Sequence, residues 1–149
     1  QLRGSIDSGL TMATHLGNGC PVDLPRHDNI IQRILSLREK LWVGFIPDGF
    51  HIEFFALKNY LELVTIDRAF MVTDAITAAR LGPGTYDLSG AIVEVDDLGV
   101  ARRPGSRNLS GSTLTMSKLR RNLKDYLDLS DSDIEKLIDL NPRKALGMV

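Results

Sequence analysis

MVTDAITAAR, residues 71–80, places a single carboxylate directly behind an apolar run. Together with Ala69 and Phe70, the first two residues of this stretch form a segment that we predict to be a buried strand. Asp74 follows the strand, and small residues come next. The aspartate is either the N-cap of a helix or a group that handles a proton in an active site. One residue does not decide between these two interpretations.

Short apolar runs alternate with helical patterns around this strand. Further strands are predicted at 10–14 and 41–46. Helices are predicted at 29–41 and 53–64, because apolar residues recur there at helical spacing. Asp28 is the expected N-cap of the first of them. Strands that alternate with helices of this length favour βα units and a parallel sheet, so the expected fold class is α/β.

The composition changes between residues 82 and 111, where Gly, Pro, Ser and Asp are frequent. Two short alternating runs, 91–95 and 100–103, flank Asp96-Asp97-Leu98-Gly99 and predict a β-hairpin. We therefore expect a β-rich insertion at 84–108.

Helical spacing returns at Met116. Another helix is predicted from 130 to 140, capped by Ser130 or by the Ser132/Glu135 pair. Asn141 and Pro142 should end this helix and open a last turn, with Asn141 as its cap.

The bulk composition limits the classes of function. The 149 residues are 43% apolar and 25% charged, and their net charge is −1. These values are typical of one globular domain and give no electrostatic signal for nucleic acid or a membrane surface. We see no signal peptide and no apolar run of about 18 residues. Cys20 is the only cysteine, which excludes an intramolecular disulfide and leads us to expect a cytoplasmic protein.

Polar residues follow each of the three predicted strands. The first strand leads into His15, the second into Asp48-Gly49-Phe50-His51, and the third into Asp74. Ligands and catalytic groups gather at these strand ends in parallel α/β proteins. Two histidines and an aspartate suit metal-assisted hydrolysis, although each histidine could instead be a hydrogen-bonded core residue.

The chain contains, in this order, the motifs THLGNG (14–19), IPDGFH (46–51), VTDA (72–75), LSGSTLTM (109–116) and NPRKALG (141–147). Together these motifs resemble those of the N-acetylglucosamine-6-phosphate deacetylases of the amidohydrolase superfamily. The resemblance runs from about residue 8 to 147 and implies a (β/α)8 barrel of the TIM type, of which the three predicted strands are strands six to eight. Residues 1–149 would then be the C-terminal part of the barrel domain, with a β-hairpin insertion.

The resemblance also implies roles for individual residues. His15 matches a metal ligand, and Asp74 matches the catalytic aspartate. His51 matches a histidine that approaches the acyl or sugar part of the substrate. The other expected substrate contacts are Asn18, Gly19, Gly111 in a loop that closes near the substrate, and Arg26, which would meet a phosphate.

The cofactor implied by the resemblance is a divalent metal, most simply zinc, at one site whose other ligands lie outside this chain. Those ligands are a glutamate and a histidine upstream of it. A complete barrel needs about 250 residues, and the opening QLRGSIDSGL looks like the end of a helix. We therefore expect the chain to be a piece of a longer enzyme and to be inactive alone.

The chain departs from the family pattern at Gly17, at Gly19-Cys20 and around Arg26, where the stretch is DLPRHDN. The exact substrate is therefore open. The leading expectation is a metal-dependent deacetylase of an amino sugar phosphate, without nucleic acid or membrane as a partner. The alternatives are an amidohydrolase for another N-acyl or cyclic amide, and a non-catalytic assembly module. The expected protein partner is a second copy or the missing N-terminal half.

Overall fold

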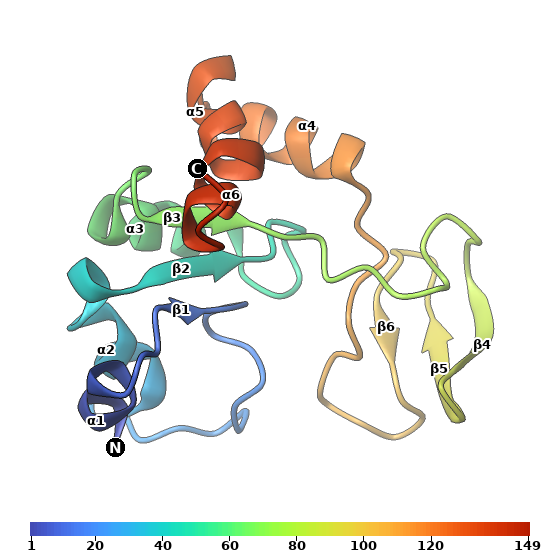
Figure 1. Ribbon diagram of the computed structural model, residues 1–149. Helices are drawn as coiled ribbons and strands as arrows, with labels where there is room; N and C mark the ends of the chain where they lie inside the picture. Colours follow the sequence, from blue (N-terminus) through green and yellow to red (C-terminus); the bar gives the residue numbers. More distant parts are fainter.

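The computed structural model describes all 149 residues as an α/β protein with two three-stranded sheets. The first sheet contains β1 (Met12–Ala13), β2 (Trp42–Phe45) and β3 (Ala69–Met71), in that spatial order. Both pairings are parallel, with Met12 opposite Trp42 and Val43 opposite Ala69. The prediction of a parallel sheet is confirmed. The strand order follows the chain order, so the three strand ends lie next to one another along one edge (Figure 1).

Helices connect the parallel strands as expected, but the first connection is broken. It contains α2 (Ile30–Leu35) and a short 3-10 helix, η1 (Arg38–Lys40), instead of one helix over 29–41. Asn29 caps α2, because its side chain accepts a hydrogen bond from the backbone N–H of Gln32 at 3.0 Å. The prediction of Asp28 as cap was wrong: its carboxylate lies 2.7 Å from Arg33 Nε. The remaining helices of this half are α1 (Leu2–Asp7) and α3 (Phe54–Val64).

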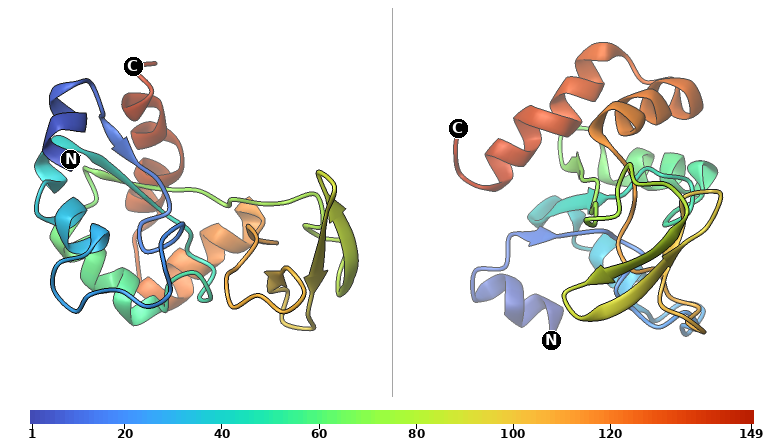
Figure 2. Two further views of the ribbon diagram at one scale, coloured as in Figure 1. Left: turned by 90° about the horizontal axis from the view of Figure 1, so that it is seen from below. Right: turned by 90° about the vertical axis from the view of Figure 1, so that its right-hand side faces the viewer.

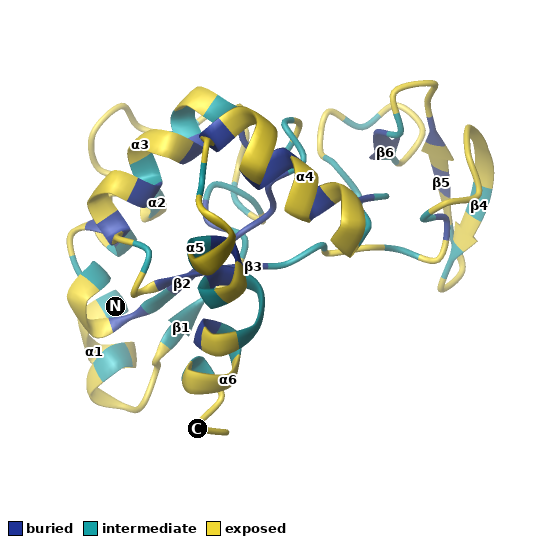
Figure 3. Ribbon diagram, turned by 90° about the horizontal axis from the view of Figure 1, so that it is seen from above, coloured by how far each residue is buried: buried dark blue, intermediate teal, exposed yellow.

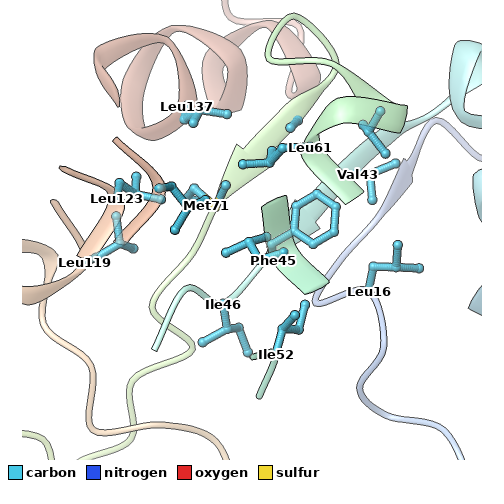
Figure 4. Close-up of a cluster of buried hydrophobic side chains, with 14 of the residues drawn as sticks. Leu16, Val43, Phe45, Ile46, Ile52, Leu61, Met71, Leu119, Leu123 and Leu137 are labelled. Atoms are coloured by element: carbon cyan, nitrogen blue, oxygen red, sulfur yellow. The ribbon is translucent and has the colours of Figure 1, made fainter. Parts of the chain in front are cut away.

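A continuous apolar core surrounds β2, the central strand (Figure 4). Val43 and Phe45 of β2 are completely buried. The buried stripe of α3 faces this core with Leu57, Leu61 and Val64, as its helical spacing predicted. Figure 3 shows that the opposite faces of the helices are exposed.

The second sheet is antiparallel and contains β4 (Gly84–Leu88), β5 (Ala91–Val95) and β6 (Ala101–Arg102). The predicted hairpin is β5–β6. Strand β4 was missed because its alternating run has only two apolar residues, Tyr86 and Leu88, and follows the turn residues Gly82, Pro83 and Gly84. Figures 1 and 2 show this sheet standing beside the parallel one, joined to it by two extended segments. It has its own small core, made of Ala78, Val93, Val95 and Ala101.

The chain ends in α4 (Met116–Leu127), α5 (Asp131–Glu135), a π-helical turn η2 (Lys136–Leu140) and α6 (Asn141–Ala145). Ser130 caps α5, as predicted, by accepting a hydrogen bond from the N–H of Asp133 at 3.1 Å. The predicted stop at Asn141 was wrong, because its backbone is helical. Its buried side chain instead donates to the carbonyls of Ile66 and Ala69 at 2.6 and 2.8 Å. None of the helices combines the length and the apolar character that a membrane-spanning segment requires.

Candidate functional site

One cavity of about 760 Å³ lies where the ends of the three parallel strands meet the loop that returns from the second sheet. His15 reaches it from the segment after β1, His51 from the segment after β2, and Asp74 from the segment after β3. These residues are far apart in sequence, and the parallel register of the sheet brings them together. Asn18, Gly19 and Gly111 line the same cavity.

His15 lies in an unusual backbone conformation, with φ of +38°. Its Nδ1 atom is buried and has no hydrogen-bond partner, although buried ring nitrogens are normally paired. Gly19, with φ of +66°, packs against this ring: a Cβ there would lie 2.9 Å from His15 Cε1. Because Gly19 has no side chain, the loop that contains it can approach the imidazole of His15 closely.

His51 is held from two directions. Its Nδ1 lies 2.6 Å from Asp48 Oδ2, and the two side chains are only 5% and 9% exposed. Asn18 donates its side-chain N–H to the carbonyl of His51 at 3.3 Å, which ties the loop after β1 to the loop after β2. Burial by itself raises the pKa of the Asp48 carboxyl, but the hydrogen bonds from the His51 ring and from backbone N–H groups hold the pKa below its ordinary value.

Asp74 is not a helix cap, because no helix follows β3 before β4. Its φ is +50°, a conformation that non-glycine residues rarely adopt. Ser112 holds it there: its N–H donates to the carbonyl of Asp74 at 2.8 Å, and its hydroxyl donates to the carbonyl of Thr73. The segment around Ser112 thus presents the Asp74 carboxylate to the cavity. Unusual backbone conformations such as those of His15 and Asp74 cluster at functional sites.

Gly111 is the tightest point of this arrangement. A Cβ there would lie 2.5 Å from Ile76 Cγ2 and 3.1 Å from the carbonyl oxygen of Asp74, at a φ of +65°. We expect Gly111→Ala to lower the free energy of unfolding by about 1–2 kcal/mol through its backbone conformation and by about 1–3 kcal/mol more through overpacking.

The matched control for Gly111→Ala is Gly105→Ala, because Gly105 has a similar φ of +72° and no atom within 4 Å of its Cβ position. Chemical denaturation of both variants measures the difference. Equal losses of stability in the two variants would contradict the close contact described at Gly111.

The arginine that lines the cavity is not the one expected from the sequence. Arg26 lies on an exposed loop and is not among the lining residues, so the geometry of this chain does not support its predicted substrate contact. Arg107 lines the cavity instead, and its Nη1 lies 3.5 Å from Asp23 Oδ2. Arg107 was not among the residues expected at the site, and nothing in its local sequence pattern pointed to the cavity. Asp48 was also missed as a partner of His51, although the two residues lie within one motif.

The residues of this chain can supply one ligand of a metal site. No group of three His, Cys, Asp or Glu side chains in the chain could hold a metal ion, whereas catalytic zinc usually has about three protein ligands. His15 can contribute one imidazole, and its unpaired ring nitrogen is consistent with a missing partner. Further ligands would have to come from outside this chain.

The sequence and the fold of the chain are similar to those of known deacetylases. No family model matches the chain. It is 27% identical to an N-acetylglucosamine-6-phosphate deacetylase of Lysinibacillus sphaericus and 27% identical to an N-acetylgalactosamine-6-phosphate deacetylase of Escherichia coli O157:H7, each over 99% of its length. The chain spans only 38% of either curated relative.

A solved structure gives the same result. The crystal structure of N-acetylglucosamine-6-phosphate deacetylase from Thermotoga maritima superposes on this chain with a TM-score of 0.88 at 28% identity. The match covers 99% of this chain and 40% of that one. The resemblance predicted from the five motifs is thus confirmed, and these relatives are hydrolytic enzymes.

Proposed function

We propose that this homologue of the N-acetylglucosamine-6-phosphate deacetylases is the C-terminal part of a metal-dependent hydrolase that removes the acetyl group from an amino sugar phosphate. The observation that carries the proposal is the convergence of His15, His51 and Asp74 on one cavity from three neighbouring strand ends. The names of the relatives supply the substrate class. The cytoplasm as the compartment stays a prediction.

The proposed fold is a partial (β/α)8 barrel in which β1, β2 and β3 are strands six to eight. Support comes from the parallel sheet, whose spatial strand order follows the chain order, and from helices that alternate with the strands. Strands β1 and β3 pair with β2 on one side only, so each has an open edge. An open edge is a template for further strands, which the missing N-terminal half or a second copy would supply.

In the proposed mechanism Asp74 moves the proton. Its carboxylate takes a proton from the attacking water as general base and returns it to the leaving amine as general acid. His15 would provide one ligand to a divalent metal, most simply zinc. When bound, such a metal lowers the pKa of water and polarises a carbonyl group. His51 would contact the acyl or sugar part of the substrate.

The test is a deacetylation assay on N-acetylglucosamine 6-phosphate with added zinc. It compares the 149-residue chain alone with the chain fused to, or mixed with, the upstream half of a related deacetylase. We expect metal-dependent turnover only in the combination. Turnover by the chain alone, lost in Asp74→Asn, would show that the proposed ligand set is wrong.

A second candidate function is a non-catalytic assembly module. The absence of three metal-binding side chains and the open edges of the parallel sheet favour it. Stable association with the upstream half, without turnover of any N-acyl substrate, would be the result that supports this alternative.

Arg107 is the proposed cation for the substrate phosphate, because it is the only lysine or arginine that lines the cavity. Its side chain is 73% exposed, so we expect Arg107→Gln to raise KM for the phosphorylated sugar by only about two- to fivefold, the range of an exposed ion pair. The KM for the unphosphorylated sugar should not change. Arg103→Gln is the control, since Arg103 is exposed on the same return segment but does not line the cavity. An equal effect of Arg107→Gln on both sugars would contradict the phosphate contact.

A further inference from the structure

Both carboxylate oxygens of Asp48 form hydrogen bonds within one short loop, residues 48–51. Oδ1 accepts the backbone N–H groups of Phe50 and His51 at 2.9 and 2.8 Å. Oδ2 lies 2.6 Å from Nδ1 of the His51 ring. The carboxylate therefore determines both the path of the loop and the orientation of the imidazole.

The loop that carries this pair is closely packed against its neighbours. Gly49 has φ of +81°, and a Cβ there would lie 2.8 Å from the ring of Phe54. The carbonyl of His51 receives the side-chain N–H of Asn18. With its side chain only 5% exposed, the His51 ring is fixed by contacts on both its backbone and its Nδ1 edge.

The protonation of the ring follows from its partner. A carboxylate has no hydrogen to donate, so a neutral imidazole facing it must carry its hydrogen on the facing nitrogen. The second ring nitrogen, Nε2, has no hydrogen-bond partner in the chain, and His51 lines the cavity. The lowered pKa of Asp48 is consistent with a carboxylate that stays ionised beside the ring.

We propose that Asp48 is a positioning residue: in the neutral form of the His51 ring it holds the hydrogen on Nδ1 and leaves Nε2 for the cavity as a hydrogen-bond acceptor. A ligand would then offer a hydroxyl or amine hydrogen to His51, and a carbonyl oxygen would not be its partner. The location of the hydrogen rests on geometry alone. The identification of the donor as a sugar hydroxyl or amine group rests on the proposed function.

The direct test is nitrogen-15 NMR of the histidine rings, at a pH high enough for the imidazoles to be neutral. The chain has only three histidines, so substitution of His15 and His27 assigns the spectrum. We expect His51 to show a protonated Nδ1 and an unprotonated Nε2. A hydrogen on Nε2 in the unmodified chain would overturn the proposal without the need for any variant.

The variant test is Asp48→Asn. The side-chain oxygen of the asparagine can keep the two backbone hydrogen bonds. Its amide N–H group then faces His51 Nδ1, so the ring hydrogen should move to Nε2. Asp96→Asn is the matched control, because Asp96 also accepts two backbone N–H groups, from Leu98 and Val100, but faces no histidine. A folded Asp48→Asn variant that keeps its hydrogen on Nδ1 would overturn the proposal.

Kinetics separate this inference from the proposed function. The enzyme for this measurement is the deacetylation-competent combination of the chain with the upstream half of a related deacetylase. In this combination we expect Asp48→Asn to lower kcat/KM by about 10- to 100-fold, as is typical when the partner that orients a functional histidine is removed. Asp96→Asn should leave kcat/KM unchanged. Activity of Asp48→Asn equal to that of the unmodified enzyme would overturn the role in positioning. If no combination shows turnover, the proposed function fails, while the NMR result still decides the state of His51.

Discussion

Replacement of Asp74 by asparagine should lower kcat for deacetylation by about 10²–10⁴-fold, the contribution of a positioned general acid–base group. The amide keeps the shape of the carboxylate and tolerates its positive φ of +50°, but it cannot take a proton from water. The backbone bonds from Ser112 to Thr73 and Asp74 do not involve the carboxylate, so they should survive. We therefore expect loss of turnover without loss of folding.

Initial rates of acetate release by the deacetylation-competent combination measure this effect. Asp128→Asn is the matched control, because Asp128 is also an exposed aspartate in the left-handed region, with φ of +55°, but lies at the end of α4 outside the cavity. If Asp74→Asn retained activity equal to that of Asp128→Asn, the assignment of the general base would be wrong.

Phe45→Ala should lower the free energy of unfolding by about 3–5 kcal/mol, the usual cost of removing a buried phenylalanine. Phe45 is completely buried in β2, and its ring stacks on Tyr60 with the centroids 6.1 Å apart. Strand β2 is paired on both sides, so the backbone has little freedom to close the resulting cavity. Because domains are stable by only about 5–15 kcal/mol, the variant should be close to unfolding at room temperature.

Urea denaturation followed by circular dichroism measures the loss in Phe45→Ala. Phe55→Ala is the control, since Phe55 is 72% exposed on α3 and its removal should change the stability by no more than about 0.5 kcal/mol. A similar, small effect of both substitutions would contradict the central position of Phe45 in the core.

The predictions that succeeded depended on local patterns. The spacing of Leu57, Leu61 and Val64 was sufficient to predict α3, and the alternation of AIVEV was sufficient to predict β5. The errors have local causes as well. The alternation in β4 is limited to Tyr86 and Leu88 and follows three turn residues, so it is too short to stand out from a loop. Asn141 was expected to be a cap because Asn-Pro commonly begins a helix. Its side chain instead donates hydrogen bonds to the carbonyls of Ile66 and Ala69, which lie more than 70 residues earlier in the chain.

The sequence by itself determined the three parallel strands, most of the helices, and that His15, His51 and Asp74 follow those strands, because burial and side-chain periodicity act over a few residues. Only the tertiary structure decided which of these groups share a cavity. The contact of Ser112 with Thr73 spans 39 residues, and that of Arg107 with Asp23 spans 84. Such contacts depend on how the two sheets are placed, which no local pattern encodes. The same physical reason explains why Arg107 lines the cavity and Arg26 does not.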